Sequence, residues 1–264
     1  MAAEVKILVE GYTNADSVAE RGLEVARPTI SLVKDQNLIV VVDPGNLESQ
    51  DLLVEALAQQ NITPDQVNIV CITHSHLDHY RNIGMFKYAK TLEYFGLWDK
   101  EYVEDLPQYL SSHIQVIKTP GHDYTGLSLV VETKEGFVAI VGDIFWREDS
   151  PKEPEDDMFA SDVKKLAESR KMILNMADFI VPGHGPKFQV KKGLVEIIKD
   201  KINGTINHLN KKVAVCQNCN RPIKNENEKC ICRPYLCYRC CLCDLDCKVC
   251  NCSHKKQYMR WRIK

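Results

Sequence analysis

Long apolar runs are missing from this sequence of 264 residues. None approaches the roughly 18 to 20 residues that a helix needs to cross a bilayer. The first residues, Met-Ala-Ala-Glu-Val-Lys, also lack the basic start and apolar stretch of a secretory signal. The sequence therefore predicts a soluble protein without a membrane partner. We expect it in the cytoplasm, or in the nucleus if the organism is a eukaryote.

Cysteine is almost absent from the first 215 residues, where Cys71 stands alone, whereas eleven cysteines lie between Cys216 and Cys252. The charge changes at nearly the same place. From residue 211 on there are 13 Lys and Arg against 4 Asp and Glu, while the first 210 residues hold 21 against 32. Such a shift in composition indicates a domain boundary. We expect an acidic domain at 1–210 and a basic, cysteine-rich domain at 211–264.

The first domain alternates between short apolar strands and helical patterns, which indicates an α/β fold. A helix with its N-cap at Ser49, another with its N-cap at Ser161 and a final helix over 194–209 are expected. The acidic, proline-containing stretch 148–157 is expected to be a solvated surface loop. The predicted strands are Val5–Gly11, Thr29–Lys34, Leu38–Val42, Val67–Thr73, Ile114–Lys118, Gly126–Glu132, Phe137–Gly142 and Phe179–Val181.

Three of the eight histidines lie within six residues, in the segment Thr73-His74-Ser75-His76-Leu77-Asp78-His79. His74 and His76 are two residues apart, so an extended segment points both to the same side. Asp78 and His79 follow where the strand gives way to a loop or helix. Imidazole and carboxylate together suit Zn²⁺, Mn²⁺ or Fe²⁺.

Three further segments each place a ligand type at the end of an apolar strand. They are Thr119-Pro120-Gly121-His122, Val141-Gly142-Asp143 and Val181-Pro182-Gly183-His184. Loops at strand ends commonly carry functional residues. One such segment alone would be unremarkable as a surface turn, but the set in this order indicates a metal site.

These residues resemble the signature of the metallo-β-lactamase superfamily, H-x-H-x-D-H followed by H, D and H, and the resemblance spans about residues 5 to 190. It implies an αββα sandwich with two metal ions at one edge. It also implies that one metal is held by His74, His76 and His122, the other by Asp78, His79 and His184, and that Asp143 bridges both.

The chemistry implied is hydrolysis of an ester-type substrate, either a phosphodiester such as RNA or a thioester. Two divalent ions, usually Zn²⁺, about 3.5 to 4 Å apart acidify a shared water and give a hydroxide at neutral pH. Asp78 is predicted to steer that hydroxide or to take up its proton. Tyr124, two residues after His122, is a candidate donor to the substrate.

Within the superfamily, the sequence is similar to the relatives of metallo-β-lactamase domain-containing protein 1, small hydrolases with an assigned role in cutting RNA. Gly142-Asp143-Ile144-Phe145, Asn82-Ile83-Gly84-Met85-Phe86 and the segment 177–186 carry this similarity. A different reaction class stays open, because persulfide dioxygenases share the fold and the ligand types. Those enzymes hold one iron and oxidise a glutathione persulfide.

The cysteine-rich domain contains the C-x-x-C pairs Cys216/Cys219, Cys237/Cys240 and Cys247/Cys250, a spacing that brings two thiolates to one tetrahedral ion. A disulfide framework is the alternative, but it needs an oxidising compartment. Twelve candidate ligands would suit about three structural Zn²⁺ ions. They are Cys216, Cys219, Cys230, Cys232, Cys237, Cys240, Cys241, Cys243, Cys247, Cys250, Cys252 and His254.

The last ten residues, 255–264, interleave basic and aromatic side chains. Such a stretch can bind phosphates and stack on bases, so nucleic acid is a candidate partner. It can equally be a solvated end or a docking segment. A non-catalytic binding module organised by zinc is the third reading of the whole chain, and the complete ligand set of the first domain disfavours it.

Overall fold

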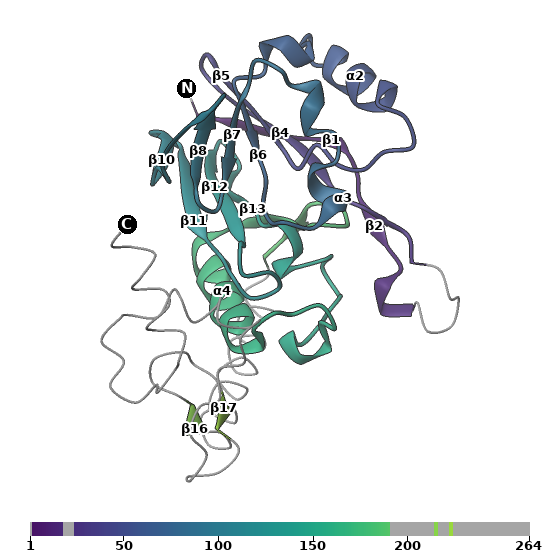
Figure 1. Cartoon of the computed structure of the whole chain (residues 1–264), viewed down its shortest axis with the longest axis vertical. Coiled ribbons are helices and arrows are strands. Elements are labelled where there is room, and N and C mark those ends of the chain that lie inside the picture. Colours follow the sequence, from purple (N-terminus) through teal and green to yellow (C-terminus); the bar gives the residue numbers. More distant parts are fainter. Residues whose placement is uncertain (1, 18–23, 191–213, 216–221, 224–264) are drawn as a thin grey trace, which may run out of the picture. The chain divides into compact units, whose positions relative to one another are not determined.

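The computed structural model describes residues 2–17, 24–190, 214–215 and 222–223 (Figure 1). The chain divides into two units, Met1–Asn203 and Gly204–Lys264. Of the second unit, the structure describes only β16 (Ala214–Val215) and β17 (Pro222–Ile223), which pair antiparallel. The helix expected over 194–209, the boundary expected at 210/211 and all the cysteine-rich ligands lie outside the described residues. They stay predictions.

The first sheet has the strand order β1-β4-β5-β6-β7-β8-β9. The three neighbours β5, β6 and β7 run parallel, and the remaining pairs are antiparallel. Its strands are β1 (Glu4–Val9), β4 (Ile30–Asp35), β5 (Leu38–Val42), β6 (Ile69–Cys71), β7 (Lys90–Glu93), β8 (Gly96–Asp99) and β9 (Tyr102–Asp105).

The second sheet has the order β10-β11-β12-β13-β14-β15, with one parallel pair, β13 and β14. Its strands are β10 (Tyr109–Ser111), β11 (Ile114–Lys118), β12 (Leu127–Thr133), β13 (Gly136–Ile140), β14 (Phe179–Val181) and β15 (Phe188–Gln189). A separate two-stranded ribbon pairs β2 (Tyr12–Thr13) with β3 (Ala26–Arg27).

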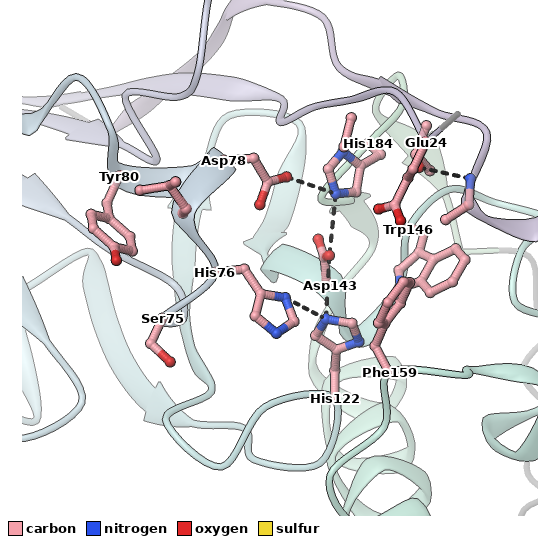
Figure 2. A pocket seen from close by; sticks show the side chains of 14 residues that line it. Glu24, Ser75, His76, Asp78, Tyr80, His122, Asp143, Trp146, Phe159 and His184 are labelled. Carbon is pink, nitrogen blue, oxygen red and sulfur yellow. Dashed lines mark hydrogen bonds and ion pairs between the residues drawn. The ribbon is translucent and has the colours of Figure 1, made fainter. Parts of the chain in front are cut away.

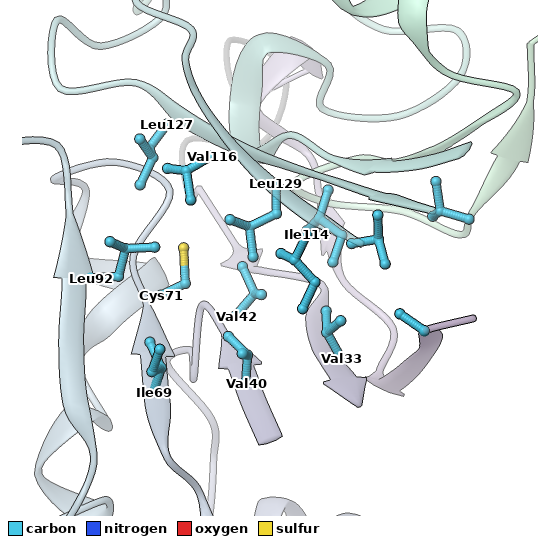
Figure 3. Close-up of a cluster of buried hydrophobic side chains, with 14 of the residues drawn as sticks. Val33, Val40, Val42, Ile69, Cys71, Leu92, Ile114, Val116, Leu127 and Leu129 are labelled. Carbon is cyan, nitrogen blue, oxygen red and sulfur yellow. The ribbon is translucent and has the colours of Figure 1, made fainter. Parts of the chain in front are cut away.

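The two sheets pack face to face over a core of aliphatic side chains (Figure 3). Strand side chains alternate between the two faces of a sheet. Val40 and Val42 accordingly point into this core, while Val41 between them packs on the other face. Leu129 and Val130 of the second sheet divide in the same way. Strands buried on both faces explain why β5 and β12 are nearly continuous apolar runs.

Helices cover the outer faces of both sheets. Helix α2 (Asp51–Ala58) packs Leu53 and Leu57 on the first sheet, and α4 (Val163–Met176) packs Leu166 and Ile173 on the second (Figure 1). The expected αββα sandwich is therefore confirmed. The other helical turns are α3 (Leu77–Tyr80), η1 (Ala15–Ser17), η2 (Pro64–Gln66), η3 (Ile83–Met85), η4 (Gly142–Ile144) and η5 (Pro154–Asp156).

Two predicted helix caps are off by one residue. The N-cap of α2 is Gln50 rather than Ser49, although the Ser49 hydroxyl accepts a hydrogen bond from Asp51 N. The N-cap of α4 is Asp162 rather than Ser161, and its carboxylate accepts from Lys165 N. Strands β7 to β10 went unpredicted because their side chains are mostly partly or fully exposed, so no apolar run marks them.

Strand β9 is the last strand of the first sheet, and all four of its residues are exposed. At the centre of the same sheet Cys71 ends β6, fully buried.

Among the described residues, no helix is both long and apolar enough to cross a membrane.

Substitution of Leu129 tests the core between the sheets. Leu129 is completely buried, so Leu129→Ala should lower the free energy of unfolding by about 2 to 5 kcal/mol. Denaturant unfolding followed by circular dichroism measures this loss. Leu52→Ala is the control, because Leu52 is 41% exposed on α2, and it should change stability by less than about 0.5 kcal/mol. Equal losses for the two variants would contradict the assigned core.

Candidate metal centre

Five strand ends converge on one region at an edge of the sandwich. Strand β5 is followed by Asp43, β6 by the segment 73–79, β11 by His122, β13 by Asp143 and β14 by His184. Parallel neighbours end at the same edge of a sheet, so β5 with β6, and β13 with β14, present their following loops together. The topology thus brings together residues from across the chain.

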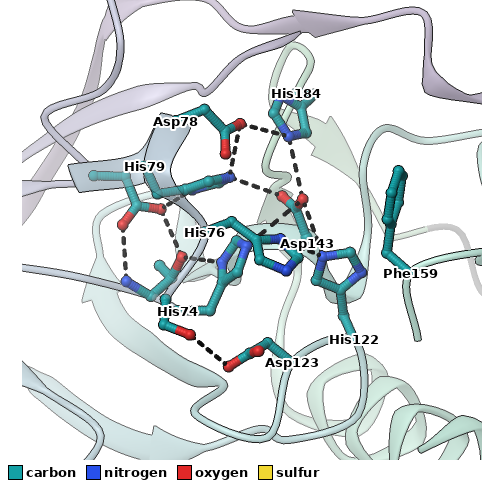
Figure 4. Close-up of polar contacts among 12 residues, drawn as sticks. His74, His76, Asp78, His79, His122, Asp123, Asp143, Phe159 and His184 are labelled. Atoms are coloured by element: carbon teal, nitrogen blue, oxygen red, sulfur yellow. Dashed lines mark hydrogen bonds and ion pairs between the residues drawn. The ribbon is translucent and has the colours of Figure 1, made fainter. Parts of the chain in front are cut away.

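The structure gathers the seven predicted ligands into two adjacent groups (Figure 4). In each group, one candidate ligand atom per residue lies within 4.8 Å of the others. The carboxylate of Asp143 belongs to the first group and also reaches the second, with Oδ1 3.3 Å from His79 Nε2 and Oδ2 3.2 Å from His184 Nε2. The first group is His74, His76, His122 and Asp143; the second is Asp78, His79 and His184.

Asp43 and Thr73 fix the rings of His79 and His74. Asp43 Oδ2 lies 2.8 Å from His79 Nδ1 and 2.6 Å from Thr73 Oγ1. The single hydroxyl hydrogen of Thr73 goes to this carboxylate, so its oxygen accepts from His74 Nδ1 at 3.1 Å. Both histidines therefore carry hydrogen on Nδ1. Their Nε2 atoms are left to face the site.

His184 and His122 are held in the same sense. His184 Nδ1 donates to the carbonyl oxygen of Arg27 at 2.9 Å, and His122 Nδ1 donates to Asp157 Oδ2 at 2.7 Å. Neither acceptor can donate, so these rings also carry their hydrogen on Nδ1. Hydrogen bonds of this kind orient metal-binding imidazoles and select the tautomer.

The inward-facing atoms fit cations and little else. His74 Nε2, His79 Nε2 and Asp143 Oδ1 are buried without a hydrogen-bond partner, whereas buried polar atoms are normally satisfied. His122 Nε2 and His76 Nδ1 face each other at 3.1 Å. Imidazole nitrogens and carboxylates are common ligands of Zn²⁺ and related ions, so these residues would hold two divalent metals.

The charges in the site keep Asp143 ionised. They also favour a proton on His79, which competes with metal binding. Burial raises the pKa of Asp143, but His184, His79 and His74 outweigh it and hold that pKa well below its usual value. Burial lowers the pKa of His79, yet Asp143 and Asp43 overcome this and raise it well above the usual value. Burial and the neighbouring His79 keep the pKa of His74 well below its ordinary value.

Close packing around Asp143 requires a residue without a side chain at Gly183. A Cβ there would overlap Asp143 Oδ1 and lie 3.0 Å from the backbone of Gly142. The Pro-Gly-His segment after β14 therefore serves two purposes. It turns the chain to present His184, and it leaves room for the carboxylate that reaches both ligand groups.

A cavity of about 350 Å³ opens over the ligands (Figure 2). Trp146 and Phe159 form an aromatic wall. Thr13 and Ala26 of the ribbon β2–β3, with Ala15 of η1, form a second wall. Arg147 ties these walls together, because it donates to Thr13 O at 3.2 Å and pairs with Asp16. The remaining lining residues are Glu24, Ser75, His76, Leu77, Asp78, Tyr80, His122, Asp143 and His184.

One predicted site residue does not lie with the others. Tyr124 is 55% exposed and is not among the residues that line the cavity, so its role toward the substrate stays a prediction. Asp78 does line the cavity, with 22% of its side chain exposed.

Sequence reasoning missed Asp43, Asp157 and the cavity wall from β2–β3. The expectation that 148–157 is wholly a solvated face is wrong at Asp157, which is buried against His122. A usable signal existed for Asp43, a carboxylate at the end of an apolar strand like Asp143. None existed for Asp157, because only the folded chain brings it to His122.

Comparison with known proteins agrees with this geometry. The family model described as metallo-beta-lactamase superfamily matches residues 25–104. Metallo-beta-lactamase domain-containing protein 1 of Xenopus laevis is 34% identical over 197 residues, which cover 71% of this chain and 82% of that protein. The chain belongs to the metallo-β-lactamase superfamily.

Two further proteins are similar to this chain. A crystal structure of a metallo-beta-lactamase from Thermotoga maritima superposes with a TM-score of 0.57 at 26% identity, covering 72% of this chain and all of that one. A protein of Methanocaldococcus jannaschii named as a metallo-hydrolase is 28% identical over 149 residues, or 55% of this chain and 70% of its own. With its two-group His and Asp site, the chain is a metal-dependent hydrolase.

Metal affinity should rise with pH across the neutral range. A histidine must lose its Nε2 proton to bind a metal, and Asp143 and Asp43 overcome the effect of burial to raise the pKa of His79 well above its usual value. Protons therefore compete most strongly below that raised pKa and progressively less above it. Chelator competition between about pH 6 and pH 9 measures the trend for the metal-free protein. An affinity independent of pH would contradict the proton assigned to His79.

Proposed function

We propose that the chain hydrolyses an uncharged acyl ester or thioester with two Zn²⁺ ions held by the seven ligands. The observation that carries the two-metal assignment is Asp143, whose two oxygens reach both ligand groups in a space without other partners for them. Three or four His and carboxylate ligands per group match the ligand types of catalytic zinc.

Zinc bound here would supply Lewis acidity, which activates water and stabilises the negative charge that develops on the carbonyl oxygen. The protein residues have complementary tasks. Asp143 stays ionised in the interior because of the surrounding histidines. Asp78 is the partly exposed carboxylate of the ligand set, so it can orient the attacking water and take up its proton.

The cavity favours an uncharged substrate. Trp146, Phe159 and Leu77 offer apolar surface beside the ligands, and Glu24 adds a negative charge. Among the described residues that line the cavity there is no Lys or Arg. Polyanionic RNA is normally held by such cations along its backbone. An ester or thioester that packs its apolar part on Trp146 and Phe159 needs none of them.

RNA cleavage is the second candidate function, and one observation favours it. Residues 211–264 carry 13 Lys and Arg against 4 Asp and Glu, with aromatic residues among them near the end. This segment could supply the backbone contacts that the described cavity lacks. We propose that the same segment holds structural Zn²⁺ through its eleven cysteines and His254.

Metal content tests the assignment. The full-length protein should contain about five zinc ions per chain, two in the first domain and about three on the cysteines. Elemental analysis of the purified protein measures this number. His184→Ala should lower it by about one, because the second group would keep only Asp78 and His79 besides the shared Asp143. A single iron per chain, with oxygen uptake on persulfides, would instead support the dioxygenase alternative.

The aromatic wall provides a test of the substrate class. Phe159→Ala removes apolar surface from the cavity and should raise KM for an uncharged thioester about 10-fold while kcat changes little. Phe95→Ala is the matched control, because Phe95 is 63% exposed and does not line the cavity.

Steady-state kinetics on a thioester series, with single-stranded RNA assayed in parallel, measures both effects. Turnover of RNA with no turnover of any ester would contradict the acyl substrate. An unchanged KM in Phe159→Ala would show that the wall does not contact the substrate.

A further inference from the structure

The segment 144–161, which joins η4 to α4, contributes both a wall of the cavity and a partner of a metal ligand. Trp146 and Phe159 belong to this segment and lie near the ring of His122, with centroid distances of 6.2 and 6.4 Å (Figures 2 and 4). The segment also contains Asp157, whose side chain is completely buried. One stretch of chain therefore connects the substrate space with the first ligand group.

Both oxygens of Asp157 are engaged. Oδ2 accepts from His122 Nδ1 at 2.7 Å, and Oδ1 accepts from the backbone N of Phe159 at 3.0 Å. The carboxylate thus holds a metal ligand on one side and the backbone of a cavity wall on the other. If Asp157 moves, the ring of His122 and the position of Phe159 move with it.

Arg170 on α4 fixes the segment from the core side. Arg170 is 1% exposed, and its guanidinium donates to the carbonyl oxygens of Ile144 at 2.6 Å and Pro151 at 3.1 Å. Burial lowers the pKa of Arg170 to about 10, against the opposing effect of Asp157 and Glu153. The side chain therefore stays cationic at neutral pH, which compensates the buried charge of Asp157.

The other oriented histidine rings take their partners from outside this segment. Asp43, directly after β5, holds His79, and Thr73, two residues after β6, holds His74. A carbonyl oxygen of β3 holds the ring of His184, whose backbone N donates to Trp146 O of the segment at 2.7 Å. Among these four, His122 alone takes its partner from the segment that also forms the aromatic wall. Of these four rings, that of His122 is therefore the one linked through a side chain to the aromatic wall.

We propose that Asp157 is a positioning residue. It fixes the ring of His122 with Nε2 toward the first metal and couples that ligand to the aromatic wall at Phe159. The proposal rests on the two-metal site proposed above. It assigns Asp157 to the first group specifically, so loss of the carboxylate weakens one of the two metals.

The test uses Asp157→Asn in the full-length protein, with Glu155→Gln as the matched control. Glu155 lies in the same segment and is exposed, so its substitution removes the same charge without touching His122. Chelator competition with Zn²⁺ should show one of the two catalytic equivalents weakened about 10- to 100-fold in Asp157→Asn, the usual effect of losing such a partner. Glu155→Gln should match the wild type.

A second readout does not depend on metal. In the metal-free protein, the imidazole NMR signals of His122, assigned with His122→Gln, should show hydrogen on Nδ1. In Asp157→Asn the fixed Nδ1 tautomer should be lost, while the His79 signals stay unchanged. Far-ultraviolet circular dichroism establishes that both variants are folded.

The possible results distinguish a failure of the role proposed for Asp157 from a failure of the proposed function. Equal weakening of both metals, no weakening, or the same loss in Glu155→Gln would each overturn the role of Asp157. If the wild type binds fewer than two catalytic metals, the proposed function fails. The tautomer of His122 in Asp157→Asn then still decides whether Asp157 positions that ring.

Discussion

The buried charge of Asp143 is the constraint on which the rest of the site depends. A carboxylate taken out of water is costly unless opposite charge and hydrogen bonds compensate it. Here the compensation comes from His184, His79 and His74, whose outer nitrogens are already hydrogen-bonded and whose inner nitrogens face the carboxylate or the metal site. Without metal, this cluster of ligands is electrostatically unfavourable. Because the surrounding fold holds it, the ligands already lie in place for metal binding.

The αββα sandwich tolerates this cluster of buried polar side chains because apolar packing elsewhere stabilises the two sheets. Continuous apolar strands such as β5 and β12 are buried on both faces, between the two sheets and under the helices. The ligands lie in the loops and short helical turns that follow strand ends. The seven ligands are therefore confined to one edge, and the aliphatic core between the sheets does not include them.

Much of the first domain could be predicted from the sequence. Apolar runs located β1, β4, β5, β6 and the central strands of the second sheet, and the seven ligands followed from motifs at strand ends. Prediction stopped where the deciding interaction joins distant segments. Nothing near Asp157 in the sequence indicates that it contacts His122. The largely exposed strands β7 to β10 have too few apolar residues in a regular pattern to be predicted as strands.

The exposed strand β9 bears on how the protein behaves at high concentration. An edge strand can pair with the same strand of a second copy and join the two sheets. Two parallel, in-register copies of β9 would place Glu104 and Asp105 of one chain against the same acidic residues of the other. Like charges facing across strands oppose such pairing. The acidic end of β9 thus disfavours parallel pairing of this exposed edge between copies.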